Sequence, residues 1–341
     1  MKGLKLITGP CSAESEEQLL GTALAVRKLG TDFFRAGLWK PRTYPGCFEG
    51  VGFEGIPWMQ KVRKDTGMKI CTEVARKEHV EACLDAGFDM LWIGARTTAN
   101  PFQVQELAEA LKGSDVTVYV KNPVSRDLEL WAGAVERLRS QGIERIGLIH
   151  RGFPNFGKSV YRNAPEWQAA VRMRIQYPEL PLICDPSHIA GDSRLVSGIS
   201  QEAMDLGLDG LMIECHISPD TALSDSRQQL TPDQLKTLLN SLNIRSKDSE
   251  DDAYRRIIAE LRATIDNCDE EIIEALSRRM EASREIGQIK REKNISILQM
   301  ARWDKVIARA IRAGSAKGLS KEFITDIFND IHKESVSIQN K

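Results

Sequence analysis

The segment that decides the fold reads Met90-Leu-Trp-Ile-Gly94, and the residues after it continue a repeating order of elements. It is an apolar run, as expected for a strand buried on both faces of a parallel sheet. The amphipathic residues 101–112 predict a helix, and Thr117–Lys121 is the next short β-rich run. A strand, a helix and a second strand in this order form a β/α unit with parallel strands.

The same order repeats over the first 240 residues or so. Eight strand-like runs occur there: Leu4–Thr8, Asp32–Arg35, Met68–Glu73, Met90–Gly94, Thr117–Lys121, Ile146–His150, Leu180–Asp185 and Gly210–Glu214. Eight β/α units predict an α/β fold of the (β/α)8 TIM barrel type. A doubly wound open sheet is the second interpretation, disfavoured because no glycine-rich dinucleotide turn follows the first run.

The composition is that of a globular protein, and the length allows one large domain and a small one. The chain has 341 residues, of which 42% are hydrophobic and 28% charged, and domains usually run to ~250 residues at most. The formal net charge of −1 argues against nucleic acid or a membrane surface as partner. No run of ~18 apolar residues and no signal-peptide pattern is present, so we expect a cytoplasmic protein.

The cysteines point to reduced thiols. The 7 cysteines include no CxxC pair, which argues against a disulfide framework or a structural zinc knuckle. We expect most of them to be buried. Cys11 is the candidate exception, because Gly9-Pro10-Cys11-Ser12 is a turn after the first run, where a thiolate could reach a metal.

Polar residues follow all eight expected strands, and the carboxyl ends of the strands form the functional rim of a barrel. One group offers sulfur, nitrogen and oxygen donors: Cys11, His188, Glu214 and Asp225. Such a mixed set predicts a divalent metal site, for which Mn, Fe, Co and Zn are all suitable. A second group is cationic: Arg35, Lys40, Arg96, Lys121 and Arg151. These cations predict a substrate with several negative charges, most simply phosphates plus a carboxylate.

Six segments carry a family resemblance: Gly9-Pro10-Cys11-Ser12, Lys40-Pro41-Arg42-Thr43, Ile93-Gly94-Ala95-Arg96-Thr97, Arg151-Gly152, Asp185-Pro186-Ser187-His188 and Ala222-Leu223-Ser224-Asp225. In order and content they resemble those of type I 3-deoxy-D-arabino-heptulosonate 7-phosphate (DAHP) synthases. The resemblance is strongest to the short beta subgroup, near the 3-deoxy-octulosonate 8-phosphate synthases, and it covers about residues 1–240. It implies a metal-dependent condensation of phosphoenolpyruvate with erythrose 4-phosphate, the first step of the shikimate pathway.

The resemblance also implies site roles by position. The metal ligands would be Cys11, His188, Glu214 and Asp225, and the phosphoenolpyruvate residues would be Arg35, Lys40, Ala95, Arg96, Lys121 and Arg151. Arg42 and Thr43 would face erythrose 4-phosphate, and Tyr44 stands where relatives have a small hydroxyl residue. A Lewis-acidic metal and fixed cations suit this condensation, with Lys40 and Lys121 as the candidates for proton transfer. The residues alone do not rank these two lysines.

The β/α alternation stops near Asn240, and the polar residues 243–251 predict a linker between a domain at 1–242 and one at 252–341. Apolar residues at three- to four-residue spacing predict a helix from Ala253 to about Lys290. Two shorter helices are expected at about 298–313 and 321–337. Three helices of such unequal length cannot enclose a core alone, so we expect a homodimer that shares the long helices.

The helical part resembles the all-helical chorismate mutases, over about residues 250–341. The matching positions are Arg262, Arg279, Lys290, Gln299, Arg302, Ser335 and Gln339. The resemblance implies rearrangement of chorismate to prephenate in an intertwined dimer, without a cofactor. Arg279 and Arg262 of the partner subunit would hold the two carboxylates, and Lys290 and Gln339 would meet the ether oxygen. Gln299 and Trp303 fall where relatives often have acids that bind the substrate hydroxyl.

We therefore predict a bifunctional shikimate-pathway enzyme whose partners are small molecules and a second copy of the chain. One alternative is a 3-deoxy-octulosonate 8-phosphate synthase barrel, although that family usually has Lys-Ala-Asn-Arg in place of Lys40-Pro41-Arg42-Thr43. The other is a helical part that only regulates and dimerises. The chain starts at the first expected strand, so we expect the helical part to be the allosteric sensor.

Overall fold

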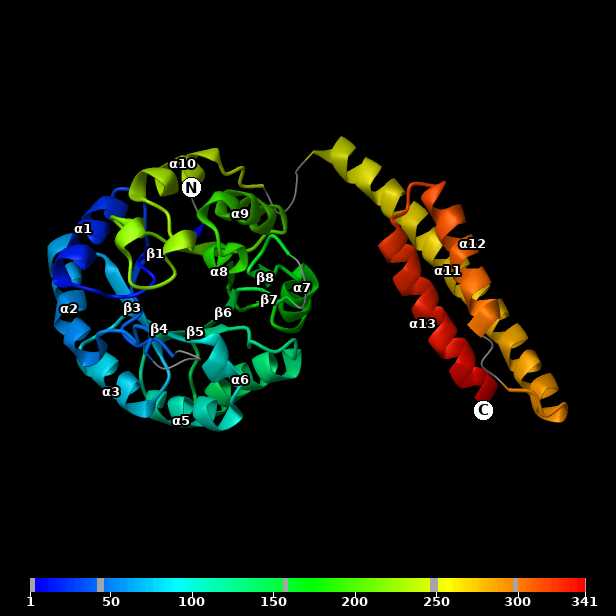
Figure 1. The fold of residues 1–341 in the computed structure, drawn as a ribbon. Coiled ribbons are helices and arrows are strands. Elements are labelled where there is room, and N and C mark those ends of the chain that lie inside the picture. Colours follow the sequence, from blue (N-terminus) through cyan, green and yellow to red (C-terminus); the bar gives the residue numbers. More distant parts are fainter. Residues whose placement is uncertain (1–3, 42–45, 156–158, 246–250, 297–299, 341) are drawn as a thin grey trace. The chain divides into compact units, whose positions relative to one another are not determined.

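The computed structural model describes residues 4–41, 46–155, 159–245, 251–296 and 300–340. The chain divides into two compact units, Met1–Lys247 and Asp248–Lys341, which we describe separately (Figure 1).

The first unit is a closed barrel of parallel strands, which confirms the predicted TIM-barrel class. In chain order its strands are β1 (Lys5–Gly9), β2 (Phe33–Arg35), β3 (Lys69–Val74), β4 (Met90–Ile93), β5 (Thr117–Lys121), β6 (Ile146–His150), β9 (Leu182–Cys184) and β10 (Gly210–Glu214). The barrel closes where β1 pairs with β10. In that pair Gly9 lies opposite Glu214, so the turn that contains Cys11 lies beside the carboxyl end of β10.

Helices ring these strands (Figure 1). They are α1 (Glu16–Arg27), α2 (Gly55–Thr66), α3 (Lys77–Asp85), α5 (Pro101–Leu111), α6 (Leu128–Ser140), α7 (Trp167–Gln176), α9 (Val196–Asp205) and α10 (Pro232–Ser241). Their starts follow ordinary capping chemistry. Asn100 caps α5 ahead of Pro101, and Thr231 forms a reciprocal capping box with Gln234 at the start of α10.

Shorter elements lie at the carboxyl ends of the strands, between the strands and the next long helix. These are η1 (Gly52–Glu54), α4 (Ala95–Thr98), the hairpin of β7 (Phe153–Pro154) and β8 (Asn163–Ala164), α8 (Pro186–Ala190), η2 (Ser193–Leu195), η3 (Pro219–Thr221) and η4 (Ser226–Gln228). They carry Ala95, Arg96 and His188 among the residues that the sequence marks as functional, and Asp225 directly precedes η4.

The barrel has two apolar layers, because alternate strand residues face inward and outward. The outward residues pack against the helices in one large cluster. The inward residues fill the interior: Ile7, Cys71, Met90, Trp92, Tyr119, Ile149, Ile183 and Met212. Trp92 forms the top of this filling, since the Arg35 guanidinium carbon lies 5.0 Å and Lys121 Nζ 5.7 Å from its ring centroid. The polar rim therefore rests on a packed interior.

The second unit consists of α11 (Asp252–Glu292), α12 (Met300–Ser315) and α13 (Lys321–Asn340). Asp251 caps α11, and α13 packs against both other helices. Gly287 permits the close contact of α11 with α13, because a Cβ there would lie 2.8 Å from Gln339 Cα.

Apolar side chains of α11 remain exposed in this unit. Ile257, Leu261, Ile265 and Ile273 have exposed fractions between 56% and 66%. Exposed apolar rows of this size usually mark an interaction face.

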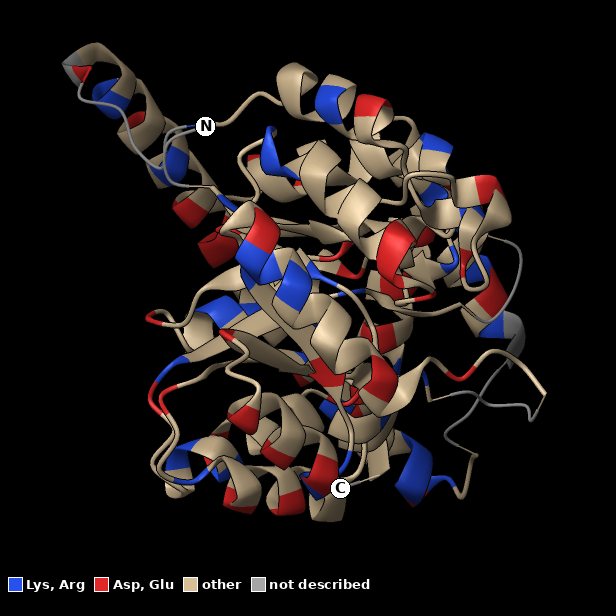
Figure 2. Cartoon of the chain, turned by 90° about the vertical axis from the view of Figure 1, so that its left-hand side faces the viewer, with Lys and Arg blue, Asp and Glu red and all other residues tan. Residues whose placement is uncertain are grey.

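Charged residues are distributed over the surface. On the side drawn in Figure 2, basic and acidic positions are mixed along the chain. Among the described helices, none combines the length and apolar character needed to cross a membrane. All seven cysteines are free, and five of them are buried, with Cys47 and Cys268 exposed.

Candidate active sites

The loops after β1 and β2 are joined by backbone hydrogen bonds. Gly37 N donates to Cys11 O at 3.2 Å, and Ala13 N donates to Gly37 O at 3.0 Å. A Cβ on Gly37 would lie 2.8 Å from Cys11 O and 3.0 Å from Lys40 Cδ, so only glycine fits this position. Lys40 consequently reaches Cys11, with its Nζ 2.9 Å from the carbonyl oxygen and 3.0 Å from Sγ.

Three of the four expected metal ligands lie together at this point. Donor atoms of Cys11, Glu214 and Asp225 are all within 4.8 Å of one another, and Cys11 Sγ is 3.4 Å from Asp225 Oδ2. The fourth, His188, has its Nε2 3.8 Å from Glu214 Oε1.

This donor set fits a divalent transition metal. Glu214 Oε1 is buried and accepts no hydrogen bond from any described residue, although Arg35 Nη2 lies 3.1 Å away. Burial, together with the charge of Glu214, raises the pKa of the Cys11 thiol to about 12. A bound cation lowers a thiol pKa strongly and would stabilise the thiolate here. Sulfur, imidazole and carboxylate donors together match Mn, Fe, Co or Zn.

Asp185 orients His188 toward the other donors. Its Oδ2 lies 2.8 Å from His188 Nδ1 and 2.8 Å from Lys121 Nζ. Burial lowers the pKa of His188, with Asp185 acting in the opposite direction, so the imidazole is neutral at pH 7 and its Nε2 can bind a metal. Burial would raise the pKa of Asp185, but its interactions with His188 and Lys121 hold that pKa well below its usual range.

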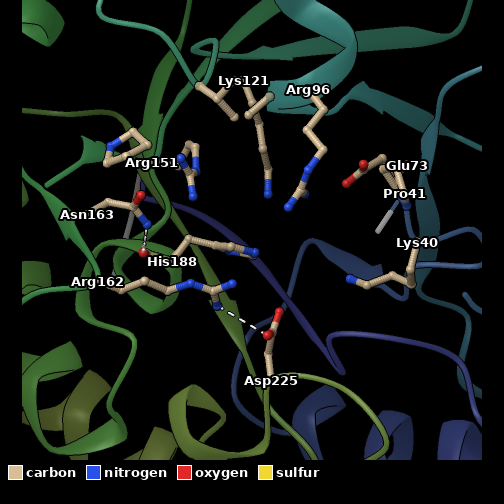
Figure 3. A pocket seen from close by; sticks show the side chains of 13 residues that line it. Lys40, Pro41, Glu73, Arg96, Lys121, Arg151, Arg162, Asn163, His188 and Asp225 are labelled. Atoms are coloured by element: carbon tan, nitrogen blue, oxygen red, sulfur yellow. Dashed lines mark hydrogen bonds and ion pairs between the residues drawn. The ribbon is translucent and has the colours of Figure 1, made fainter. Parts of the chain in front are cut away.

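A cavity of about 270 Å³ opens beside these ligands. Side chains of Arg96, Lys121 and Arg151 point into it, with His188, Lys40 and Asp225 opposite (Figure 3). Burial lowers the pKa of Arg151 to about 10, so Arg151 is still a cation at neutral pH. The complete lining is Lys40, Pro41, Glu73, Ala95, Arg96, Lys121, Val124, Arg151, Pro154, Arg162, Asn163, His188 and Asp225. So many cations around a small cavity favour an anionic ligand with more than one acidic group.

Arg35 occupies a different place from the other predicted cations. It is 1% exposed and does not line the cavity. It pairs with Glu214 at 3.1 Å and donates to Cys11 O at 3.3 Å. The family resemblance placed Arg35 among the phosphoenolpyruvate residues. In the structure Arg35 instead pairs with Glu214, a candidate metal ligand.

The cavity includes residues to which the sequence analysis assigned no role. Arg162 and Asn163 reach it from β8 and the residue before it, and Glu73 accepts a hydrogen bond of 2.9 Å from Trp92 Nε1. Two-residue strands such as β7 and β8 are too short for any periodic signal. Its position at the carboxyl end of β3 was the only sequence feature that pointed to a role for Glu73 in the site. Arg42 and Thr43, together with Tyr44, lie outside the described residues.

The helical unit has a second cavity, of about 370 Å³. It is lined by Arg279, Ala282, Ser283, Ile286, Lys290, Arg302, Trp303, Val306, His332, Ser335 and Gln339. Arg279 donates to Ser335 Oγ, and Lys290 Nζ donates to Gln339 Oε1 at 3.4 Å. Five of the predicted mutase residues therefore meet in one place.

Two of the predicted mutase residues are absent from this lining. Gln299 lies outside the described residues. Arg262 is 17 positions from Arg279 along α11, which is ~26 Å at the helical rise. Because of that separation, one chain cannot bring both arginines to one small ligand.

His332 is a lining residue that the sequence analysis missed. Its ring stacks on Trp303 with centroids 4.1 Å apart and planes at 16°. Burial and the charge of Arg279 lower its pKa. Its position three residues before Ser335, on the same face of α13, was the available signal.

A parallel barrel with a cationic cavity and a cluster of metal donors at its strand ends defines an enzyme for anionic substrates. The helical unit adds a second cationic cavity. The chain belongs to the DAHP synthetase I family, whose profile matches residues 2–250. Residues 261–340 match the type II chorismate mutase family, so the chain also carries a chorismate mutase domain.

Individual relatives agree with the barrel assignment. The phospho-2-dehydro-3-deoxyheptonate aldolase of Thermotoga maritima is 31% identical over 237 residues, covering 70% of this chain and 68% of that protein. Its crystal structure superimposes with a TM-score of 0.63 at 30% identity, covering 70% and 68% of the two chains. The 2-dehydro-3-deoxyphosphooctonate aldolase of Wolinella succinogenes is 28% identical, covering 70% of this chain and 97% of that protein.

Proposed function

We propose that the protein catalyses two reactions of the shikimate pathway. The barrel would condense phosphoenolpyruvate with erythrose 4-phosphate to DAHP and phosphate, and the helical unit would rearrange chorismate to prephenate. The observation that carries the first proposal is the cationic cavity of about 270 Å³ beside Cys11, Glu214 and Asp225. Its size and charge suit a small molecule that bears a phosphate and a carboxylate.

Cys11, His188, Glu214 and Asp225 would hold the divalent metal, Mn, Fe, Co or Zn, which when bound supplies Lewis-acid chemistry for the aldehyde oxygen. Arg96, Lys121 and Arg151 would orient the enol phosphate, with Ala95 at the cavity wall and Arg35 supporting Glu214. Arg42 and Thr43 would bind the aldose phosphate. In this arrangement C3 of phosphoenolpyruvate forms a bond to C1 of the aldose, water adds at C2, and the bond from C2 to the phosphate oxygen breaks.

Lys40 is the better candidate for giving a proton to the former aldehyde oxygen. Burial lowers the pKa of Lys40, but Cys11 and Glu214 outweigh it and raise the pKa above its ordinary value. The ammonium group is thus maintained beside Cys11 Sγ, at 3.0 Å. Lys121, by contrast, is held 2.8 Å from the Asp185 carboxylate, which favours a binding role for it.

In the helical unit, Arg279, Lys290, Arg302, Ser335 and Gln339 would select the reactive conformer of chorismate. Lys290 and Gln339 would stabilise the negative charge that grows on the ether oxygen, which requires no metal or other cofactor. Arg262 of the partner subunit would complete the site in a homodimer formed through the exposed apolar face of α11.

An assay of both reactions on the intact protein tests the proposal. We expect a chelator to abolish the condensation and to leave the rearrangement unchanged, with added Mn²⁺ restoring the first. Condensation that persists after the metal has been removed, shown by elemental analysis, would exclude the metal-dependent reaction.

A second candidate for the barrel is 3-deoxy-octulosonate 8-phosphate synthesis. It is favoured by relatives named 2-dehydro-3-deoxyphosphooctonate aldolases, such as that of Wolinella succinogenes at 28% identity. Turnover of erythrose 4-phosphate against arabinose 5-phosphate separates the two. We expect kcat/KM to be higher for the four-carbon sugar, and the opposite preference would replace our proposal.

The helical unit would also act as the sensor of prephenate or chorismate for the barrel. Arg279→Ala should abolish the rearrangement and the inhibition of condensation by prephenate, while leaving uninhibited condensation unchanged. Arg278→Ala is the matched control, because Arg278 is exposed and pairs only loosely with Glu274, at 3.6 Å. Undiminished inhibition in Arg279→Ala would exclude this sensor.

A further inference from the structure

One short segment, Ser224–Gln229, provides more than the candidate ligand Asp225. Asp225 has a left-handed backbone with φ of 46°, and η4 begins directly after it. This turn directs the two following amide side chains, Gln228 and Gln229, back into the barrel rim. Both are buried, with exposed fractions of 1% and 2%.

Gln228 contacts Glu214 directly. Its Nε2 donates to Glu214 Oε2 at 2.8 Å, in a buried position. The other oxygen, Oε1, lies 3.1 Å from Arg35 Nη2 and 3.8 Å from His188 Nε2. The carboxylate is therefore held by a hydrogen bond at Oε2 and by the ion pair with Arg35 at Oε1, which restricts its rotation about the terminal bond.

The same amide also connects to Asp225. Gln228 Oε1 accepts from Arg162 Nη1 at 2.8 Å. The same Nη1 lies 3.2 Å from Asp225 Oδ1, and Figure 3 shows this ion pair. Asp225 Oδ2 is the oxygen near Cys11 Sγ, at 3.4 Å. Arg162 thus occupies one oxygen of Asp225 and leaves the other toward the thiol.

Gln229 supports the third donor in a parallel way. Its Oε1 accepts from Cys11 N at 2.9 Å, and its Nε2 donates to Ser224 O at 2.9 Å. These two bonds join the Cys11 turn to the loop after β10.

We propose that Gln228 is a positioning residue for the metal site, fixing Glu214 directly and Asp225 through Arg162. This inference depends on the proposed metal site of the barrel and deepens it. An amide can donate to one carboxylate and accept from a guanidinium at once, which neither a carboxylate nor an apolar side chain can do. Hydrogen bonds to ligating carboxylates orient them, and removing such bonds usually lowers metal affinity ~10- to 100-fold.

The test is Co²⁺ binding to the metal-free full-length protein, measured by competition with a chelator. The sulfur-to-cobalt charge-transfer band reports Cys11 ligation, and the visible ligand-field bands report coordination geometry. We expect Gln228→Met, which is similar in size, to weaken Co²⁺ binding ~10- to 100-fold and to change the ligand-field bands. In Gln228→Asn the shorter amide cannot reach both partners, so Co²⁺ affinity and the ligand-field bands should change in the same direction. This variant provides the test if the methionine variant does not fold.

The matched control is Gln201→Leu. Gln201 Nε2 makes the same kind of bond, to Asp205 Oδ1 at 3.0 Å, on the exposed surface of α9. The Gln201→Leu protein should bind Co²⁺ with the affinity of the unchanged protein. Wild-type affinity and bands in folded Gln228 variants would overturn the positioning role alone. Absence of the sulfur-to-cobalt band in the unchanged protein would instead overturn the proposed metal site and this inference with it.

Discussion

At the scale of single residues, charge and burial decide which protonation states the barrel rim can hold. The buried thiol of Cys11 has a carboxylate at 3.4 Å and an ammonium at 3.0 Å. The imidazole of His150 is buried and that of His188 is half-buried, and burial lowers the pKa of each. Because their pKa values are shifted, such buried groups make stability depend on pH. Substitutions at these positions therefore test the assigned roles.

Cys11→Ala should remove the metal from the barrel and with it the condensation, while the rearrangement continues at its normal rate. The reason is that Cys11 supplies the single sulfur among the candidate donors. Elemental analysis of the dialysed protein and assays of both reactions measure this. Cys47→Ala is the control, because Cys47 is exposed. Full metal content in Cys11→Ala would contradict the assignment.

His150 should make the barrel sensitive to acid. Burial lowers its pKa to about 4, its Nε2 contacts Pro165 O, and its Nδ1 has no hydrogen-bond partner among the described residues. Because the unfolded chain takes up the proton first, the stabilisation is complete above pH ~6.5 and is lost as the pH falls toward ~4, by roughly 3 kcal/mol.

Urea unfolding of the barrel at several pH values measures this loss. In His150→Gln the decrease between pH ~6.5 and ~4 should be smaller. It should not disappear, because burial also lowers the pKa of His79 to about 4. An equal decrease in the variant and the unchanged protein would show that His150 is not its source.

At the scale of elements, a glycine inside a helix can be needed for contact or merely tolerated. Gly287 in α11 faces α13, where a Cβ would meet the Gln339 backbone at 2.8 Å. A Cβ added at Gly133 in α6 would have no neighbouring atom within 4 Å. Both positions have helical backbone, so alanine favours each helix intrinsically and only the neighbours differ.

Gly287→Ala should separate α11 from α13 and lower the kcat/KM of the rearrangement, because Lys290 and Gln339 would move apart. Gly133→Ala should instead stabilise the barrel by up to ~1 kcal/mol, as helix propensity predicts. Steady-state kinetics and thermal unfolding of the two variants test the pair. A fully active Gly287→Ala protein would mean that the helices can adjust without cost.

At the scale of the whole molecule, the proposed mutase site requires two chains. Arg262 and Arg279 are too far apart on one helix to hold one ligand. Variants Arg262→Ala and Arg279→Ala should each be inactive in the rearrangement. When they are mixed and refolded together, each heterodimer has one intact site, so activity should return to about a quarter of normal. If no activity returns, the shared site is wrong.

Much of this architecture follows from local sequence, and some of it does not. The eight barrel strands are apolar runs with polar residues at their ends, so the fold and most cavity cations could be predicted. The pairing of Arg35 with Glu214 depends on closure of β1 against β10, which brings together residues 179 positions apart. Arg162 depends on the β7–β8 hairpin, whose two-residue strands carry no periodic pattern.

The closure of β1 against β10 also determines when the proposed metal site could form during synthesis on the ribosome. Cys11 is translated early, whereas Glu214 and Asp225 emerge only after nearly the whole barrel has left the exit tunnel. Until then the thiol has neither carboxylate beside it and no strand β10 to pair with β1. Loading of the proposed metal site in its native geometry would therefore be a late event, because Glu214 and Asp225 follow Cys11 by more than 200 residues.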